Sequence, residues 1–174
     1  MPKLLDDSLS FFKDKISDCI KSNKSIFVTT HIDCDGLTSG SIITKALIRA
    51  GAKCTVRTSK EFSKNIAESF RTDSRDFHIV TDLGGGFGKN LNESLGDNWF
   101  VLDHHQIPEE EMDNQNVINA WKYGIDGGVD ICAGGMAYLA SIASERRDTR
   151  MSAKLWKTTT STRFPLRLPT IGTR

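Results

Sequence analysis

Residues 25–36 read Ser-Ile-Phe-Val-Thr-Thr-His-Ile-Asp-Cys-Asp-Gly, a β-branched and apolar run that leads directly into three potential metal ligands. The first half of this stretch predicts a buried strand, and the apolar spacing from Leu37 onward predicts a helix. Between them, an extended or tightly turned loop can bring His31, Asp33 and Asp35 toward one centre. Clustered carboxylates lose hydration and repel one another unless a cation lies among them. The stretch predicts a metal site, with a solvated acidic turn that caps the helix as the plainer alternative.

The sequence on either side repeats this alternation of strand and helix. Strands are expected at 25–30, 53–58, 77–81, 99–102 and 116–119, and helices at about 6–21, 37–50, 62–70, 90–95 and 133–144. Strands that alternate with helices form βαβ units. The prediction is therefore an α/β fold, with a doubly wound, mostly parallel five-stranded sheet and helices on both faces.

Residues that can bind metal follow three of the expected strands. His31, Asp33 and Asp35 follow the first, Asp82 the third, and the Asp-His-His triplet at 103–105 the fourth. Because a parallel sheet binds ligands outside the carboxyl ends of its strands, these side chains are expected at one edge. Mixed carboxylate and imidazole ligands suit Mn²⁺ or Mg²⁺, with Mn²⁺ favoured by the histidines. Two such ions, bridged by Asp82, would suit phosphoester hydrolysis.

The composition predicts a soluble intracellular protein. Its four cysteines, at 19, 34, 54 and 132, form no CxxC pair, which argues against a disulfide framework and a zinc ribbon. No apolar run approaches the ~20 residues of a membrane span, and the amino terminus lacks the layout of a signal peptide. We therefore expect a cytoplasmic location and no membrane partner.

The chain changes character near residue 149. All 22 acidic residues lie at or before Asp148, whereas six of the 23 basic residues follow it, and no period of helix or strand continues there. A basic tail can bind nucleic acid nonspecifically. The absence of any period favours a different interpretation, with one domain over 1–148 and a disordered or aberrant basic tail over 149–174.

Three motifs resemble those of the DHH phosphoesterases. They are Val28–Gly40 (VTTHIDCDGLTSG), Thr81–Gly84 (TDLG) and Leu102–His105 (LDHH). Their combination in this order is specific, and the resemblance covers about residues 20–147. Within that superfamily the chain is most similar to archaeal RecJ-like single-strand nucleases, including those associated with the GINS replication complex. The loop at 124–128 and the helix start at 132–138 also fit that branch.

The resemblance implies a ligand set for two Mn²⁺ or Mg²⁺ ions. Asp33 and Asp35 would each ligate a metal, Asp82 would bridge the two ions, and His104 would complete the second. His31 would either ligate a metal or contact phosphate. Two parts of the family pattern are not found, namely the aspartate of a fourth motif and a smaller substrate-binding domain. The resemblance therefore implies an incomplete nuclease with impaired activity.

The remaining site residues concern catalysis and the substrate. By the same resemblance, His105 would lie beside the scissile phosphate, as a catalytic and substrate-binding residue. Asp103 would act in catalysis by orienting His104, a usual arrangement for a metal-bound imidazole. Ser39, near the start of a predicted helix, is a candidate substrate contact, and helix capping explains it equally well.

The leading function is hydrolysis of single-stranded DNA or RNA from an end, in DNA replication or repair, with a GINS-type complex as an implied partner. Within the enzyme class, the alternatives are a phosphodiesterase for nano-RNA or cyclic dinucleotides, and a pyrophosphatase. A further alternative of another class is a non-catalytic scaffold of the replication complex. Hydrolysis of long single strands, compared with that of di- and trinucleotides, distinguishes the enzymatic alternatives.

Overall fold

The computed structural model describes residues 3–145, and the predicted tail at 149–174 lies outside them. The helices are α1 (Lys3–Lys21), α2 (Cys34–Arg49), α3 (Lys64–Ser69), α4 (Gly88–Leu95) and α5 (Ala133–Glu145), and the strands are β1 (Ser25–His31), β2 (Lys53–Ser59), β3 (Phe77–Thr81), β4 (Trp99–Asp103) and β5 (Val117–Asn119). Short 3-10 turns cover 70–72, 109–111 and 120–123. No helix among the described residues combines the length and hydrophobicity that crossing a membrane requires.

The five strands form one sheet in the order β2-β1-β3-β4-β5, and every neighbouring pair is parallel. The predicted fold class is therefore confirmed. β2 lies on one side of β1 and β3 on the other, so the strand order changes direction between β1 and β3. Loops that leave such a point diverge and open a crevice at the carboxyl edge of the sheet. The loops that follow β1, β3 and β4 carry the predicted ligands to this edge.

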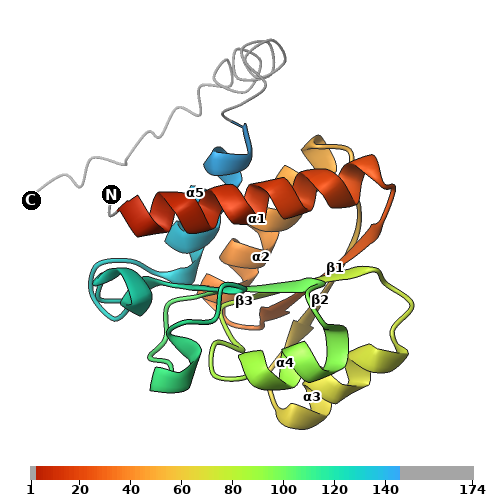
Figure 1. The fold of residues 1–174 in the computed structure, drawn as a ribbon. Helices are drawn as coiled ribbons and strands as arrows, with labels where there is room; N and C mark the ends of the chain where they lie inside the picture. The colour runs from red at the N-terminus through yellow and green to blue at the C-terminus, as the bar shows by residue number, and fades with distance from the viewer. Residues whose placement is uncertain (1–2, 146–174) are drawn as a thin grey trace, which may run out of the picture. The chain divides into compact units, whose positions relative to one another are not determined.

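Each face of the sheet is covered by helices, as Figure 1 shows, with α1, α2 and α5 on one side and α3 and α4 on the other. Alternate residues of each strand supply the two cores. Val28 and Ile79 belong to the core under the first set of helices, whereas Phe27 and Val80 belong to the core over α3 and α4. Strands buried on both faces read as continuous apolar runs, which is why these strands were recognisable in the sequence.

Two helices, α1 and α2, begin three residues earlier than predicted, and the start of α2 affects the site. The helix begins at Cys34, three residues before the predicted Leu37, so Asp35 lies in its first turn and not in an extended loop. Asp33 is the N-cap, and its Oδ1 accepts a hydrogen bond from the Gly36 amide at 2.8 Å. A Cβ at Gly36 would overlap the His31 backbone, so only glycine allows this early turn. Asp33 therefore caps this helix through Oδ1, while its Oδ2 lies beside His31.

Candidate metal centre

Asp82 lies at the centre of the site and directly follows β3. Its side chain is almost completely buried, and neither carboxylate oxygen has a hydrogen-bond partner. Burial, together with the negative charges of Asp33 and Asp35, raises the pKa of Asp82 to about 6. Buried polar groups are rarely left unpaired, and a charged one is costly to leave so. The arrangement calls for a cation or a proton at this point.

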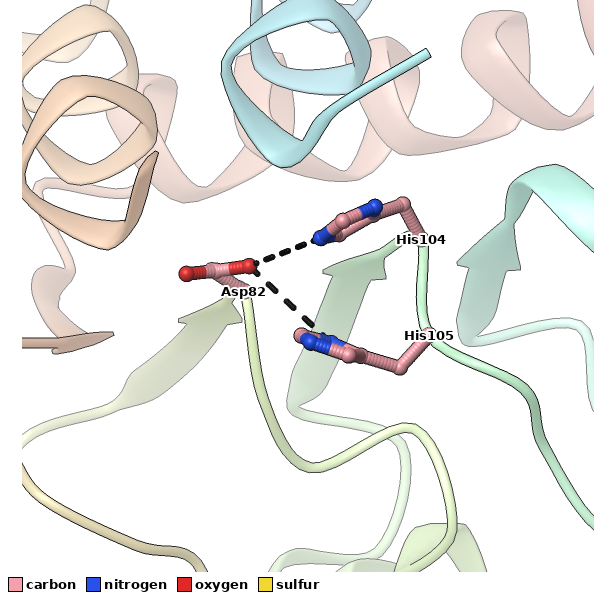
Figure 2. A group of neighbouring side chains, drawn as sticks. All are labelled: Asp82, His104 and His105. Atoms are coloured by element: carbon pink, nitrogen blue, oxygen red, sulfur yellow. Dashed lines mark ion pairs between the residues drawn. The ribbon is translucent and has the colours of Figure 1, made fainter. Parts of the chain in front are cut away.

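Two groups of potential ligands share Asp82. In one, the Asp82 oxygens lie near His104 and His105, with Oδ1 at 3.2 Å from His104 Nε2 and 4.0 Å from His105 Nδ1 (Figure 2). In the other, His31 Nδ1 lies 2.9 Å from Asp33 Oδ2 and 3.7 Å from Asp82 Oδ2. Within each group the candidate ligand atoms all lie within 4.8 Å of one another. This spacing suits one ion in each group, with the Asp82 carboxylate between them.

Backbone carbonyls determine which nitrogen of two imidazoles faces the carboxylates. His104 Nδ1 lies 2.6 Å from the carbonyl oxygen of Gly127. His31 Nε2 lies 3.1 Å from the carbonyl oxygen of Lys60. A carbonyl oxygen only accepts, so these nitrogens carry the protons. In the neutral rings the other nitrogen therefore presents a lone pair toward Asp82. Lone pairs and carboxylates that converge in this way are the donor set of a metal ion.

His105 differs from the other two histidines. Its Nδ1 donates to Asp103 Oδ1 at 2.8 Å, and this hydrogen bond raises the pKa of His105 to about 8. The His105 ring is therefore a cation at neutral pH, and more than half of its side-chain surface is exposed. A half-exposed imidazolium beside a carboxylate cluster suits contact with a phosphate better than contact with a metal.

Asp103 holds the His105 ring, and the prediction that it orients the His104 ring is wrong. The Asp103 carboxylate is buried and accepts hydrogen bonds from the His105 ring and from the Gly85 and His104 amides. Burial alone would raise the pKa of Asp103, but the hydrogen bond from His105 and that ring's charge outweigh it and lower the pKa. His104 donates a hydrogen bond to Asp103 through its backbone amide, whereas its ring contacts the Gly127 carbonyl.

Asp35 joins the site to the amino terminus of α5. Its Oδ2 accepts a hydrogen bond from the Ala133 amide at 2.6 Å, and its Oδ1 accepts one from the Gly134 amide at 2.8 Å. The same Oδ2 lies 3.4 Å from His104 Nε2. Asp35 thus caps a helix that is 98 residues away in sequence while it faces His104, a member of the first group of ligands. Nothing in the sequence predicted this double contact.

Ser39 is completely buried, so the prediction that it contacts a substrate is wrong. Its hydroxyl lies 3.0 Å from the Gly36 carbonyl and 3.1 Å from the Thr81 hydroxyl. The Thr81 hydroxyl in turn donates to that of Thr30 at 2.8 Å. These buried hydroxyls join the ends of β1 and β3 to the first turn of α2. They support the loops that carry Asp33, Asp35 and Asp82.

The structure brings the predicted ligands His31, Asp33, Asp35, Asp82 and His104 to one edge of the sheet, and His105 and Asp103 lie beside them. It also adds groups that sequence reasoning missed, namely the carbonyls of Lys60 and Gly127 and the indole of Trp121, which donates to the His104 carbonyl at 2.9 Å. Because every residue has a backbone carbonyl, the sequence could not indicate that those of Lys60 and Gly127 contact the histidines.

Comparison with known proteins gives a consistent result. The model of the DHH family N-terminal domain matches residues 25–160, which run past the last described residue. An uncharacterized protein of Methanocaldococcus jannaschii is 32% identical over 124 residues, which cover 67% of this chain and 28% of that protein.

Solved structures share the fold. RecJ of Thermus thermophilus in complex with Mn²⁺ matches with a TM-score of 0.67 at 21% identity, over 80% of this chain and 21% of that chain. A manganese-bound exonuclease RecJ matches with a TM-score of 0.69 at 21% identity, over 80% of this chain and 38% of that chain. The DHH domain of a member of a ribosomal protein family has a TM-score of 0.61 at 19% identity, over 82% of this chain and 40% of that chain. The chain thus spans about a fifth to two fifths of the length of these relatives.

Proposed function

This chain belongs to the DHH family, through its N-terminal domain, and from that premise we propose that it is a two-metal phosphodiesterase that hydrolyses single-stranded nucleic acid from an end, in DNA replication or repair. The observation that carries the proposal is the buried Asp82 carboxylate, whose oxygens accept no hydrogen bond and which is shared by two groups of carboxylate and imidazole ligands. Such a donor set suits Mn²⁺ or Mg²⁺, and the solved structures named above include two with manganese.

The residues of the chain divide into two roles. Asp33, Asp82 and His31 would hold one ion, and Asp35, Asp82 and His104 the other. Divalent ions at such a site supply positive charge for a phosphoester and lower the pKa of water, which makes it a nucleophile at neutral pH. Asp82 would keep the two positions close, because its one carboxylate, directly after β3, would contribute to both.

His105 would act on the substrate. Asp103 keeps its Nδ1 protonated and fixes the plane of the ring. The other nitrogen, Nε2, then carries the second proton of an imidazolium, which can donate to a phosphate oxygen or to the leaving oxygen. This role needs a cationic ring at the operating pH, which the hydrogen bond from His105 to Asp103 favours by raising the pKa of His105 in the metal-free chain.

The test is hydrolysis of an end-labelled single-stranded oligonucleotide with Mn²⁺, compared with binding of Mn²⁺ by calorimetry. We expect Asp82→Asn to lose both properties, because asparagine tolerates the positive φ of 61° at this position but cannot bridge two cations. We expect His105→Gln to lose hydrolysis by about 100-fold or more and to keep its affinity for Mn²⁺ within a few-fold.

Asp97→Asn is the matched control for the removal of a carboxylate, because Asp97 is exposed and precedes the opposite, amino end of β4. The proposal fails if Asp82→Asn binds Mn²⁺ and cleaves as well as Asp97→Asn does. Hydrolysis of di- and trinucleotides but not of long strands would assign the chain to the short-substrate phosphodiesterases. Metal binding without any hydrolysis would favour a scaffold. The GINS-type partner and the cytoplasmic location stay predictions.

A further inference from the structure

The segment from Asn119, the last residue of β5, to Gly134, in the first turn of α5, contacts the metal centre at three points. The indole Nε1 of Trp121 donates to the His104 carbonyl at 2.9 Å. The Gly127 carbonyl accepts from the His104 ring, and the amides of Ala133 and Gly134 donate to Asp35. Two candidate ligands, Asp35 in the first turn of α2 and His104 directly after β4, are thus held by one segment that contains none of the ligands itself.

We infer that Trp121 is a positioning residue of this metal centre, acting through His104. Its hydrogen bond holds the main chain of His104, while the Gly127 carbonyl holds the ring. With the carbonyl and the ring of His104 both held, its Nε2 lies 3.2 Å from Asp82 Oδ1 and 3.4 Å from Asp35 Oδ2. Partners of this kind set the orientation of a metal-bound imidazole and the proton on its other nitrogen.

The position of Trp121 is itself determined by β5. Asn119 ends that strand, directly beside Asp103 of β4. Its Oδ1 accepts from the Trp121 amide at 3.0 Å, and its Nδ2 donates to the His105 carbonyl at 3.0 Å. Asn119 therefore holds the carbonyl of His105, and Trp121, two residues later, holds that of His104. This turn begins directly after Asn119, which pairs with Asp103 in the sheet.

Gly127 shows how closely these groups pack. A Cβ at this position would overlap the His104 carbonyl and would lie 3.0 Å from the Trp121 indole nitrogen. The backbone of Gly127 therefore approaches His104 more closely than any other residue would allow. The indole nitrogen borders the same space, so a change at Trp121 alters the site at which the His104 ring is held.

The inference rests on the proposed function, because it concerns the same metal site. The decisive variant is Trp121→Phe, which keeps an aromatic ring but removes the donor to the His104 carbonyl. We expect its affinity for Mn²⁺, measured by calorimetry on the full chain, to fall roughly tenfold, within the range usual for such outer partners.

The matched control is Trp99→Phe. Trp99 begins β4, at the end opposite to His104, and its indole donates to Asn92 and to the Gly96 carbonyl. This variant also loses an indole hydrogen bond on the same strand, so we expect it to lose stability and to keep its affinity for Mn²⁺. A role for Trp121 in stability alone would lower the melting temperature of both variants and leave both affinities unchanged.

A measurement on the unmodified chain keeps the inference testable if Trp121→Phe does not fold. The Trp121 indole N–H signal, followed by NMR, should shift when Mg²⁺ is added, because a cation on the His104 ring alters the carbonyl that this N–H contacts. The Trp99 signal should stay in place. An unshifted Trp121 signal, or a Trp121→Phe chain that binds Mn²⁺ as tightly as the unmodified one, overturns the inference. An unmodified chain that binds no Mn²⁺ overturns the proposed function as well.

Discussion

At the scale of single residues, the positions of protons separate the three histidines of the site. His31 and His104 each donate one N–H to a backbone carbonyl, so their second nitrogens are left for a cation. His105 donates to a carboxylate, which makes its ring a cation. Three residues of one type thus have two chemical roles, and the hydrogen-bond partner of each ring decides which.

The fourth histidine, His78, lies away from the site and leads to a prediction about pH. It is buried within β3, stacked on Phe70 at 4.6 Å between ring centroids, and neither ring nitrogen makes a well-formed hydrogen bond. Burial lowers the pKa of His78 from 6.5 to about 4, with the charges of Arg57 and Arg75 acting in the same direction. Between these values the unfolded chain binds a proton that the folded chain does not, so stability falls as the pH decreases from about 6.5 toward 4.

We therefore expect the free energy of unfolding, measured in urea, to decrease by about 2 kcal/mol more between pH 7.5 and pH 5 in the unmodified chain than in His78→Leu. The other titrating groups are common to both chains and cancel in the comparison. An equal decrease in both would show that His78 takes up its proton without unfolding.

At the scale of elements, the periodic parts of the chain were predictable and the contacts between their ends were not. The strands and most helix limits follow from apolar spacing, because burial on one or both faces dictates that spacing. The early start of α2 depends on the room beside the His31 backbone, which no local pattern reveals. The cap that Asp35 provides for α5 depends on two loops that meet only in the folded chain.

The cap on α5 can be tested by hydrogen exchange. In Asp35→Asn, only one side-chain oxygen remains to accept from the Ala133 and Gly134 amides, and the negative charge at the helix amino terminus is lost. We expect these amides to exchange about 5- to 10-fold faster, which corresponds to roughly 1 kcal/mol for a cap.

Asp33→Asn is the control for that experiment, because asparagine is as good an N-cap as aspartate. The Gly36 amide at the start of α2 should therefore keep its protection in Asp33→Asn. Unchanged exchange of Ala133 and Gly134 in Asp35→Asn would mean that α5 does not depend on the contact with Asp35.

At the scale of the whole molecule, the site joins segments that are distant in sequence. The loops after β1, β3 and β4 and the segment before α5 meet at one edge of the sheet, and their carboxylates repel one another without a cation. A metal that binds only the folded chain therefore stabilises all of these segments together. A nucleic acid phosphate should also approach this edge more readily when cations are bound.

We expect Mn²⁺ at about 100 times its Kd to add about 2.7 kcal/mol to the free energy of unfolding and to raise the Tm by roughly 5–10 °C, an effect that EDTA reverses. Asp97→Asn should show the same increase, whereas Asp82→Asn should show none. Equal stabilisation of both variants would place the binding site elsewhere.

Apolar spacing along the chain was enough to predict that five strands alternate with helices, and that His31, Asp33, Asp35, Asp82 and His104 lie at or beyond the ends of three strands. Parallel strands end at one edge, so the place of the site was determined as well. The contacts that hold each side chain became visible only in the folded chain. Asp103 accepts a hydrogen bond from the His105 ring, Gly127 and Trp121 hold the ring and the carbonyl of His104, and Ser39 is buried. Backbone carbonyls and amides make most of these contacts, and because nearly every residue type carries them, the sequence does not mark which ones meet a given side chain in the folded chain.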